Sequence, residues 1–230
     1  MSTEDPVKRL KRLDTCAVSD AMDKLGLKGA VGGLKQRAGN ARVAGRVMTF
    51  RLVPHGQGPA TTGPARHLGT TAIERAQPGD VIVVEQRTGI ESGCWGGILT
   101  LGAKVRGIAG VVADGLVRDL DEAVAYDFPV FSRGSTARTA RGRVTEADTG
   151  EPITVGEVRV CAGDYVIADR SDVVFIAAAD IERVLEAAEM IFAREAAMTK
   201  ALLEGTPISQ VMGANYENML QPSAADGSKG

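Results

Sequence analysis

An arginine and an aspartate stand side by side near the end of an apolar segment, and this pair is well suited to chemistry. The segment GVVADGLVRDLDEA begins with the apolar run Gly110 to Ala113 and continues to Arg118 and Asp119. Neighbouring side chains on a loop cannot easily face the same way, so we expect each to have its own partner. One arrangement that fits is an anion on the guanidinium and a metal ion on the carboxylate. In the simpler alternative, Asp119 caps the next helix and Arg118 is solvated.

Two adjacent glycines, Gly96 and Gly97 in SGCWGGILT, form the second candidate element. The sequence predicts that a helix begins there, directly after a loop. The first turn of a helix offers free N–H groups and the positive end of the helix dipole. Glycine also lets a small anion approach the backbone closely. The alternative is that the two glycines serve only the close packing of the helix on a strand.

These candidates belong to a predicted α/β fold. The sequence favours alternating strands and helices, with strands at 42–53, 81–85, 108–114 and 129–134 and helices at 70–76, 94–107 and 120–127. This order is typical of parallel βαβ crossovers. Ligands bind beyond the carboxyl ends of the strands in such sheets. Because both candidate pairs follow strands that we expect to be adjacent, they should converge on one pocket.

Further helices and strands are predicted on both sides of this unit. The first helix, capped by Thr15 or Ser19, should stop at Gly26. Residues 142–178 predict short antiparallel strands, and residues 179–204 a charged amphipathic helix. We expect the helices to bury their apolar positions, namely Val18, Ala21, Met22, Leu25, Leu99, Ala103, Val105, Ile181, Val184, Leu185, Ala188 and Phe192. No linker divides the chain, so we predict one domain over 1–205 and a partly disordered extension over 206–230.

Composition limits the classes of function. The chain has 230 residues and a net charge of -2, so it shows no electrostatic footprint for nucleic acid. Its apolar stretches are shorter than the roughly 20 residues of a membrane span, and its first residues do not resemble a signal peptide. We therefore expect a cytoplasmic protein without nucleic acid or membrane partners. Three scattered cysteines, Cys16, Cys94 and Cys161, are expected to be buried, reduced residues.

Four segments in order, DTCAVSDAMDKLG, QPGDVIVVE, WGGILTLGAKVRGIAGVVADGLVRD and FPVFSRG, resemble a known family. It is the family of 4-hydroxy-4-methyl-2-oxoglutarate/4-carboxy-4-hydroxy-2-oxoadipate aldolases, which includes the regulator of ribonuclease E activity. The resemblance covers about residues 10–195. It implies a swivelling β/β/α domain, similar to a phosphohistidine domain, with N- and C-terminal helices. It also implies a homotrimer or a hexamer with the active site at the subunit interface.

The resemblance also implies roles for the candidate residues. The backbone of residues 96–99 (Gly96, Gly97, Ile98 and Leu99) would hold the pyruvate part of a substrate, and Arg118 would contact its carbonyl. Asp119 would coordinate a divalent metal, Mg²⁺ or alternatively Mn²⁺. The implied reaction is a class II retro-aldol cleavage of a 4-hydroxy-2-oxo acid to pyruvate and a second oxo acid. Metal and arginine would stabilise the pyruvate enolate. Decarboxylation of oxaloacetate passes through the same enolate.

Two positions depart from the family pattern. Gly97 stands where the aldolases have an acid, so a supporting acid must come from elsewhere, and Glu91, Asp114 and Glu195 are the candidates. Glu195 would be lent by a neighbouring subunit. The loop before residue 70 also differs, and His67 is either the equivalent of the family histidine or a surface residue. Two other functions therefore stay open: a non-catalytic regulator of a ribonuclease, and a same-fold enzyme with a different 2-oxo or hydroxy acid substrate.

Overall fold

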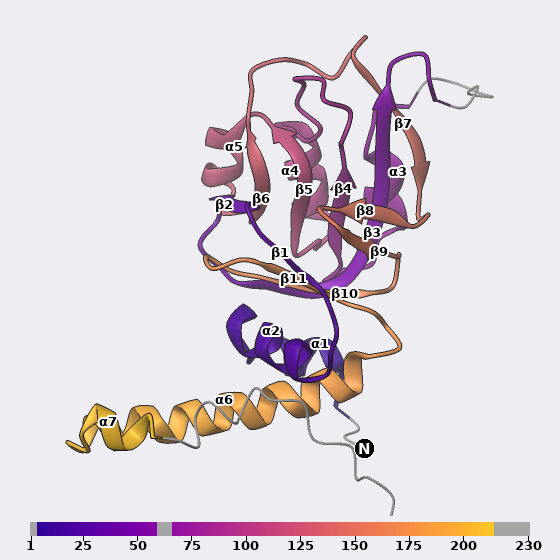
Figure 1. Ribbon diagram of the computed structural model, residues 1–230. Coiled ribbons are helices and arrows are strands. Elements are labelled where there is room, and N and C mark those ends of the chain that lie inside the picture. Colours follow the sequence, from indigo (N-terminus) through magenta and orange to yellow (C-terminus); the bar gives the residue numbers. More distant parts are fainter. Residues whose placement is uncertain (1–3, 59–65, 214–230) are drawn as a thin grey trace, which may run out of the picture.

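The fold centres on a curled mixed sheet, seen in a computed structural model that describes residues 4–58 and 66–213 (Figure 1). Four parallel strands form its middle: β3 (Val43–Pro54), β4 (Val81–Glu85), β5 (Gly110–Val117) and β6 (Val130–Ser135). They lie in this order in the sheet. The predicted βαβ crossovers and the adjacency of the second and third of these strands are thereby confirmed.

Antiparallel strands extend the sheet on both sides. Beyond β3 lie β10 (Tyr165–Ala168), β11 (Val173–Ile176) and β1 (Ala30–Val31), while β2 (Lys35–Ala38) pairs with β6. The long strand β3 pairs first with β10 and further on with β4 and β7 (Val144–Thr149). Because one strand takes part in three pairings, the sheet curls around it. A separate hairpin consists of β8 (Ile153–Val155) and β9 (Val158–Val160).

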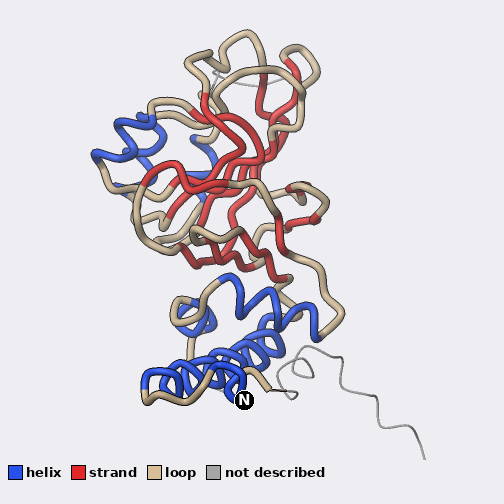
Figure 2. Tube along the Cα trace, turned by 60° about the vertical axis from the view of Figure 1, so that its left-hand side comes forward, coloured by secondary structure: helices blue, strands red, loops and turns tan. Residues whose placement is uncertain are grey.

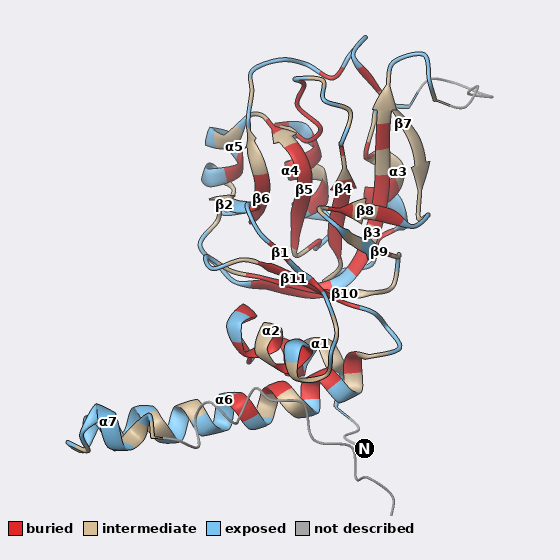
Figure 3. Ribbon diagram, viewed as in Figure 1, coloured by how far each residue is buried: buried red, intermediate tan, exposed pale blue. Residues whose placement is uncertain are grey.

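The helices form two groups on different parts of the sheet (Figures 1 and 2). One group contains α3 (Thr70–Arg75), α4 (Gly97–Val105) and α5 (Leu120–Ala125), which follow β3, β4 and β5. The other contains α1 (Pro6–Leu10), α2 (Thr15–Lys24) and the long α6 (Ile181–Leu203), which lie below β10 and β11 in Figure 1. Within α6, the buried residues lie between Ile181 and Ile191, and the C-terminal part of the helix is largely exposed (Figure 3).

Several local predictions were wrong in detail. Asp14, not Thr15 or Ser19, caps α2, and its carboxylate accepts a hydrogen bond from the Ala17 N–H at 2.8 Å. Val105 is 79% exposed because it lies on the outer face of α4, and Phe192 is exposed because Ile191 takes the buried position. The structure also contains α1, β1 and β2, which the sequence pattern did not reveal.

The cysteines and the chain end give mixed results. Cys94 is buried as expected and all three cysteines are free, but Cys16 is exposed on α2. The predicted C-terminal extension, residues 206–230, includes the short helix α7 (Ile208–Val211). Its residues 214–230 lie outside the described part. Among residues 4–58 and 66–213, no helix is both long and apolar enough to cross a membrane.

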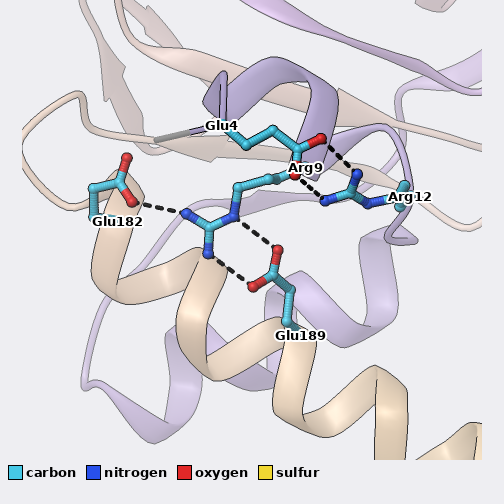
Figure 4. Close-up of polar contacts among 5 residues, drawn as sticks. All are labelled: Glu4, Arg9, Arg12, Glu182 and Glu189. Atoms are coloured by element: carbon cyan, nitrogen blue, oxygen red, sulfur yellow. Dashed lines mark hydrogen bonds and ion pairs between the residues drawn. The ribbon is translucent and has the colours of Figure 1, made fainter. Parts of the chain in front are cut away.

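A buried arginine connects the N-terminal helix α1 with the long helix α6 (Figure 4). Arg9 in α1 is 3% exposed, and its guanidinium donates to two carboxylates of α6. It bonds to both oxygens of Glu189 at 2.8 Å and to Glu182 at 2.8 Å. The neighbouring pair Arg12–Glu4 is more exposed. The bond with Arg9 also lowers the pKa of Glu189 below its ordinary value.

We predict that Arg9→Ala lowers the free energy of unfolding by about 1–3 kcal/mol, because it leaves two carboxylates without their cation. Arg12→Ala is the matched control and should have a much smaller effect, because the Arg12–Glu4 pair is exposed. Urea denaturation at pH 7 measures both. The depressed pKa of Glu189 makes its stabilisation present at neutral pH and lost as the pH falls below the ordinary glutamate value of 4.5. The Arg9→Ala deficit should therefore shrink in acid, and a deficit that does not change would contradict the role of this pair.

Candidate functional site

A small pocket lies at the carboxyl ends of β4 and β5, as the sequence predicted for the candidate residues. Its volume is about 150 Å³, and both predicted pairs line it. The pocket wall contains residues from four segments: His67 and Leu68 before α3; Gly93, Trp95, Gly96, Gly97, Ile98 and Leu99 around the start of α4; Arg118 and Asp119 after β5; and Thr139 and Ala140. The glycine backbone, the guanidinium and the carboxylate therefore meet at one place.

The loop before α4 is held against the end of β5 by backbone pairing. Gly93 forms a parallel bridge with Leu116, the Cys94 N–H donates to the Leu116 carbonyl at 2.8 Å, and the Arg118 N–H donates to the Trp95 carbonyl at 2.9 Å. This pairing explains why β5 continues to Val117, past the predicted end at residue 114. An irregularity in the pairing with β6 between Ala113 and Leu116 accompanies the extension.

Trp95 fixes the turn that leads into α4. Its indole N–H donates to the Thr100 hydroxyl at 2.9 Å, and that hydroxyl donates to the Gly96 carbonyl at 3.0 Å. Next to it, burial raises the pKa of the Cys94 thiol to about 12. Because the thiol stays protonated at neutral pH, Cys94 is unsuited to be a nucleophile. The side chains of Trp95 and Thr100 thus hold the turn from which the first N–H groups of α4 project.

Asp119 has a left-handed backbone conformation, with φ 57° and ψ 42°. This conformation is costly for a residue other than glycine, and such strain often occurs at functional sites. It turns the carboxylate so that one oxygen accepts from Arg118 Nε at 3.1 Å and the other from the Gly97 N–H at 3.0 Å. The expectation that the neighbours do not pair was therefore wrong. Asp119 stands at the N-cap position of α5, but its side chain makes no capping bond.

Two glycines make room for the Arg118 side chain. A Cβ atom on Gly93 would lie 2.9 Å from Arg118 Cγ, and one on Gly96 would lie 3.2 Å from the same atom. Separations this short are rare between real side chains, so a larger residue at 93 would displace the arginine. The Cβ atom added to Gly96 would also lie 2.8 Å from Asp119 Oδ2. Gly96 therefore makes room for the candidate site residues, which differs from the simpler alternative of helix-on-strand packing alone.

Glu122 occupies the space beside Gly97 where a side chain is missing. A Cβ atom on Gly97 would lie only 1.6 Å from Glu122 Oε2 and 2.5 Å from Glu122 Cδ. The carboxylate of Glu122 therefore stands where the first atoms of an acidic residue at 97 would stand. Together with Asp119, it lies against the Gly96–Gly97 backbone. The sequence analysis did not identify Glu122, although this residue lies only three positions after Asp119.

The signal that could have revealed Glu122 is its spacing. Asp119 and Glu122 are three residues apart at the start of a helix, and side chains with that spacing lie on the same face. The same spacing is typical of a capping box, which gives the pattern an ordinary structural explanation. Only the missing capping bond and the position over Gly97 distinguish the two.

The three acids that the sequence proposed lie elsewhere. Asp114 is buried on β5 and accepts from Arg133 Nε and from the Gly156 N–H, each at 2.7 Å. Glu91 is exposed and pairs with Arg138 at 3.1 Å. Glu195 lies on α6, where burial raises its pKa, with a further contribution from nearby aspartates. None of the three is among the described residues of the pocket wall, and a Glu195 carboxylate lent by a second subunit stays a prediction.

The carboxylate donors at the site fit Mg²⁺ or Mn²⁺ better than ions that prefer nitrogen or sulfur ligands, such as Zn²⁺ or Cu²⁺. No three His, Cys, Asp or Glu side chains in the described ranges lie close enough together to hold an ion. Asp119 lies against Gly96 and Gly97, and Glu122 lies against Gly97. Mg²⁺ keeps several waters and needs only one or two carboxylates from the protein, so this donor set suits it.

The chain belongs to the RraA-like family, described as Aldolase/RraA, whose model matches residues 15–175. The single-domain α/β fold expected from the resemblance is confirmed by the sheet and helices described above and by a solved relative. The structure of Streptomyces coelicolor RraAS2, described as an unusual member of the RNase ES inhibitor RraA protein family, is similar with a TM-score of 0.71. It is 23% identical, and the match covers 85% of this chain and 96% of that one.

Two relatives illustrate the range of the family. A putative 4-hydroxy-4-methyl-2-oxoglutarate aldolase of Halalkalibacterium halodurans is 29% identical over 219 residues, which cover 95% of this chain and 97% of that protein. Protein DlpA of Legionella pneumophila is 26% identical over 204 residues. That match covers 89% of this chain but only 32% of DlpA, so the chain spans about a third of that relative.

We predict that Asp119→Gly is more stable than Asp119→Ala by about 1 kcal/mol, because only glycine adopts the left-handed conformation without strain. Both variants lose the same carboxylate contacts, so the comparison isolates the backbone. The control is Glu186, an exposed position in α6, where the order should be reversed and alanine should be the more stable. Thermal and urea denaturation measure both pairs. If alanine is the more stable variant at position 119 as well, the strain at Asp119 is absent in solution.

Proposed function

We propose that this protein is a divalent-metal-dependent lyase that releases pyruvate from a 2-oxo acid. The observation that carries the proposal is the meeting of Arg118, Asp119 and Glu122 at the N-terminus of α4. Arg118, Asp119 and free backbone N–H groups at one pocket, with the Glu122 carboxylate beside Gly97, suit a substrate that carries a carboxylate beside a ketone. Aldolase-named relatives in the family support the same class of reaction.

The pocket residues divide the work of binding. The N–H groups of Ile98 and Leu99, in the first turn of α4, have no carbonyl of their own helix to bond to and suit the substrate carboxylate. The Arg118 guanidinium, held beside Asp119, suits the ketone oxygen and the negative charge that develops on it. A volume of about 150 Å³ is appropriate to a fragment of the size of pyruvate. The apolar walls formed by Trp95 and Leu99 help to exclude water.

Asp119 and Glu122 would hold the metal, Mg²⁺ in the first instance. The bound ion would act as a Lewis acid for the enolate that bond cleavage produces. Glu122 takes the place of the family acid at position 97, because its carboxylate stands in the same space. We propose a 4-hydroxy-2-oxo acid as the substrate, with oxaloacetate as a second one, since both yield the enolate of pyruvate.

We predict Mg²⁺-dependent release of pyruvate, measured by coupling to lactate dehydrogenase, from oxaloacetate and from 4-hydroxy-4-methyl-2-oxoglutarate. Arg118→Ala should lower kcat roughly 10²–10³-fold, by the loss of one electrostatic stabiliser. Asp119→Asn and Glu122→Gln preserve shape but remove charge, so they should raise the Mg²⁺ concentration needed for half-maximal rate. Glu91→Gln is the control acid and should resemble the wild type. No pyruvate from either substrate, or release that survives both EDTA and Arg118→Ala, would refute the lyase.

We further predict that Gly97→Asp restores part of the activity lost in Glu122→Ala. Once the Glu122 side chain is removed, an acid at 97 can occupy the vacated space. Gly97→Ala in the same background is the control and should restore nothing, because it adds a side chain without a charge. Mg²⁺ titration of pyruvate release compares the three variants. Equal activity of the aspartate and alanine variants would show that the two positions are not equivalent.

A non-catalytic regulator of a ribonuclease is the second candidate function. The name of the S. coelicolor neighbour, an RNase ES inhibitor family member, favours it, as does the exposure of apolar side chains such as Ile98 and Val105 on α4. A pull-down against ribonuclease E, run beside the activity assay, separates the two functions. Activity lost in Asp119→Asn with unchanged partner binding supports the lyase, whereas binding without any activity supports the regulator.

A further inference from the structure

His67 reaches the same pocket as Arg118 from a different segment of the chain. It lies just before α3, and its neighbour Leu68 packs against the core that surrounds the pocket. Of the two histidines in the chain, His55 bonds to the Thr145 hydroxyl and is not in the described pocket wall. His67 is therefore the imidazole that the fold brings to the site.

A backbone contact fixes which nitrogen of His67 carries its proton. Nδ1 lies 3.0 Å from the Leu68 carbonyl oxygen. A carbonyl can only accept, so Nδ1 must be the donor and must carry the hydrogen. In the neutral ring, Nε2 is then the free acceptor, which is the tautomer that a general base requires.

Glu146 holds the segment that carries His67. From β7, one oxygen of its carboxylate accepts from the Gly69 N–H at 2.6 Å, and the other accepts from the Thr149 hydroxyl. The segment is also closed by Thr70, whose hydroxyl donates to the His67 carbonyl at 2.7 Å. Gly69 has φ 76° and lies close to Phe50 and Leu99, so its position is fixed on both sides. The imidazole thus depends on a carboxylate that is 77 residues away from Gly69 in the chain.

We propose that His67 is the general base of the retro-aldol reaction and that Glu146 is its positioning residue. The inference rests on the proposed lyase function. His67 Nε2 takes the proton of the 4-hydroxyl group, and the bond between C3 and C4 breaks as the C4 carbonyl forms. The electron pair of that bond becomes the enolate of pyruvate, which is stabilised beside Arg118. The enolate carbon then takes a proton from water, and His67 returns its own proton to solvent, so atoms and charge balance.

Decarboxylation distinguishes this role from a general contribution to the pocket. Oxaloacetate loses carbon dioxide directly, and the electron pair of the broken bond again becomes the pyruvate enolate. There is no hydroxyl proton to remove, so bond cleavage needs no base. Arg118, Asp119 and Glu122 serve both reactions, whereas His67 should serve only one of them.

The experiment compares the two substrates in the Mg²⁺-loaded enzyme. His67→Ala should lower kcat/KM for 4-hydroxy-4-methyl-2-oxoglutarate roughly 10²–10⁴-fold, as expected for the loss of a general base. Its decarboxylation of oxaloacetate should be nearly unchanged, and His55→Ala should leave both reactions nearly unchanged. An equal loss for both substrates, no loss for either, or a wild-type enzyme that only decarboxylates would overturn the role of His67. Failure of the wild type with both substrates would instead refute the lyase itself.

Glu146 is tested in combination with His67. Glu146→Ala should lower only the aldol reaction, and Glu146→Gln, which keeps an acceptor oxygen, should recover part of the loss. In the His67→Ala background, Glu146→Ala should have no further effect on aldol cleavage, because the two residues act as a unit. Additive losses, or an equal loss of decarboxylation in Glu146→Ala, would show a merely structural role. Urea midpoints of all variants confirm that they are folded.

Discussion

The left-handed backbone of Asp119 is the constraint on which the site depends. Because that conformation turns the carboxylate back toward its own neighbour and across to α4, one residue connects the end of β5 with the first N–H group of the helix. The pairing of Gly93 with Leu116 brings the two segments to the required separation. Both contacts of the Asp119 carboxylate, with Arg118 Nε and with the Gly97 N–H, therefore depend on this backbone conformation.

The relation between Gly97 and Glu122 supports the proposal that Glu122 replaces the acid that the resemblance implies at position 97. The two side chains would compete for the same space, so an acid at 97 and the observed position of Glu122 exclude each other. The carboxylate of Glu122 reaches across from α5 on a longer side chain, whereas an aspartate at 97 would hold its carboxylate closer to the backbone of α4. The two carboxylates would therefore differ in conformational freedom, and this difference affects how tightly a small cation is held.

The parts of the site that the sequence predicted are those that depend on local order. Arg118, Asp119 and the glycines follow predicted strands, and the carboxyl ends of parallel strands must meet, so their convergence could be inferred. The conformation of Asp119 could not, because it depends on a backbone angle that short patterns do not encode. The spacing of Glu122 from Asp119 was a signal, but the same spacing is typical of a capping box. The cap at Asp14 and the exposure of Val105 were missed for a related reason, since a shift of one or two residues changes which face is buried. The contact between Glu146 and Gly69 joins distant segments, and no local pattern reports it.

This difference between local and distant contacts divides the pocket into two parts with separate origins. Arg118, Asp119 and Glu122 lie within five consecutive residues, so the residues proposed to stabilise an enolate come from one short segment and its glycine partners. His67 depends instead on β7, through Glu146 and the loop before α3. Changes in that loop can alter which proton is removed, and so which substrate is cleaved, without disturbing the enolate site. A chain that lost His67 but kept the five residues would retain the chemistry of decarboxylation. Under the proposed roles, a change at His67 would therefore alter the reaction while the Arg-Asp pair is kept.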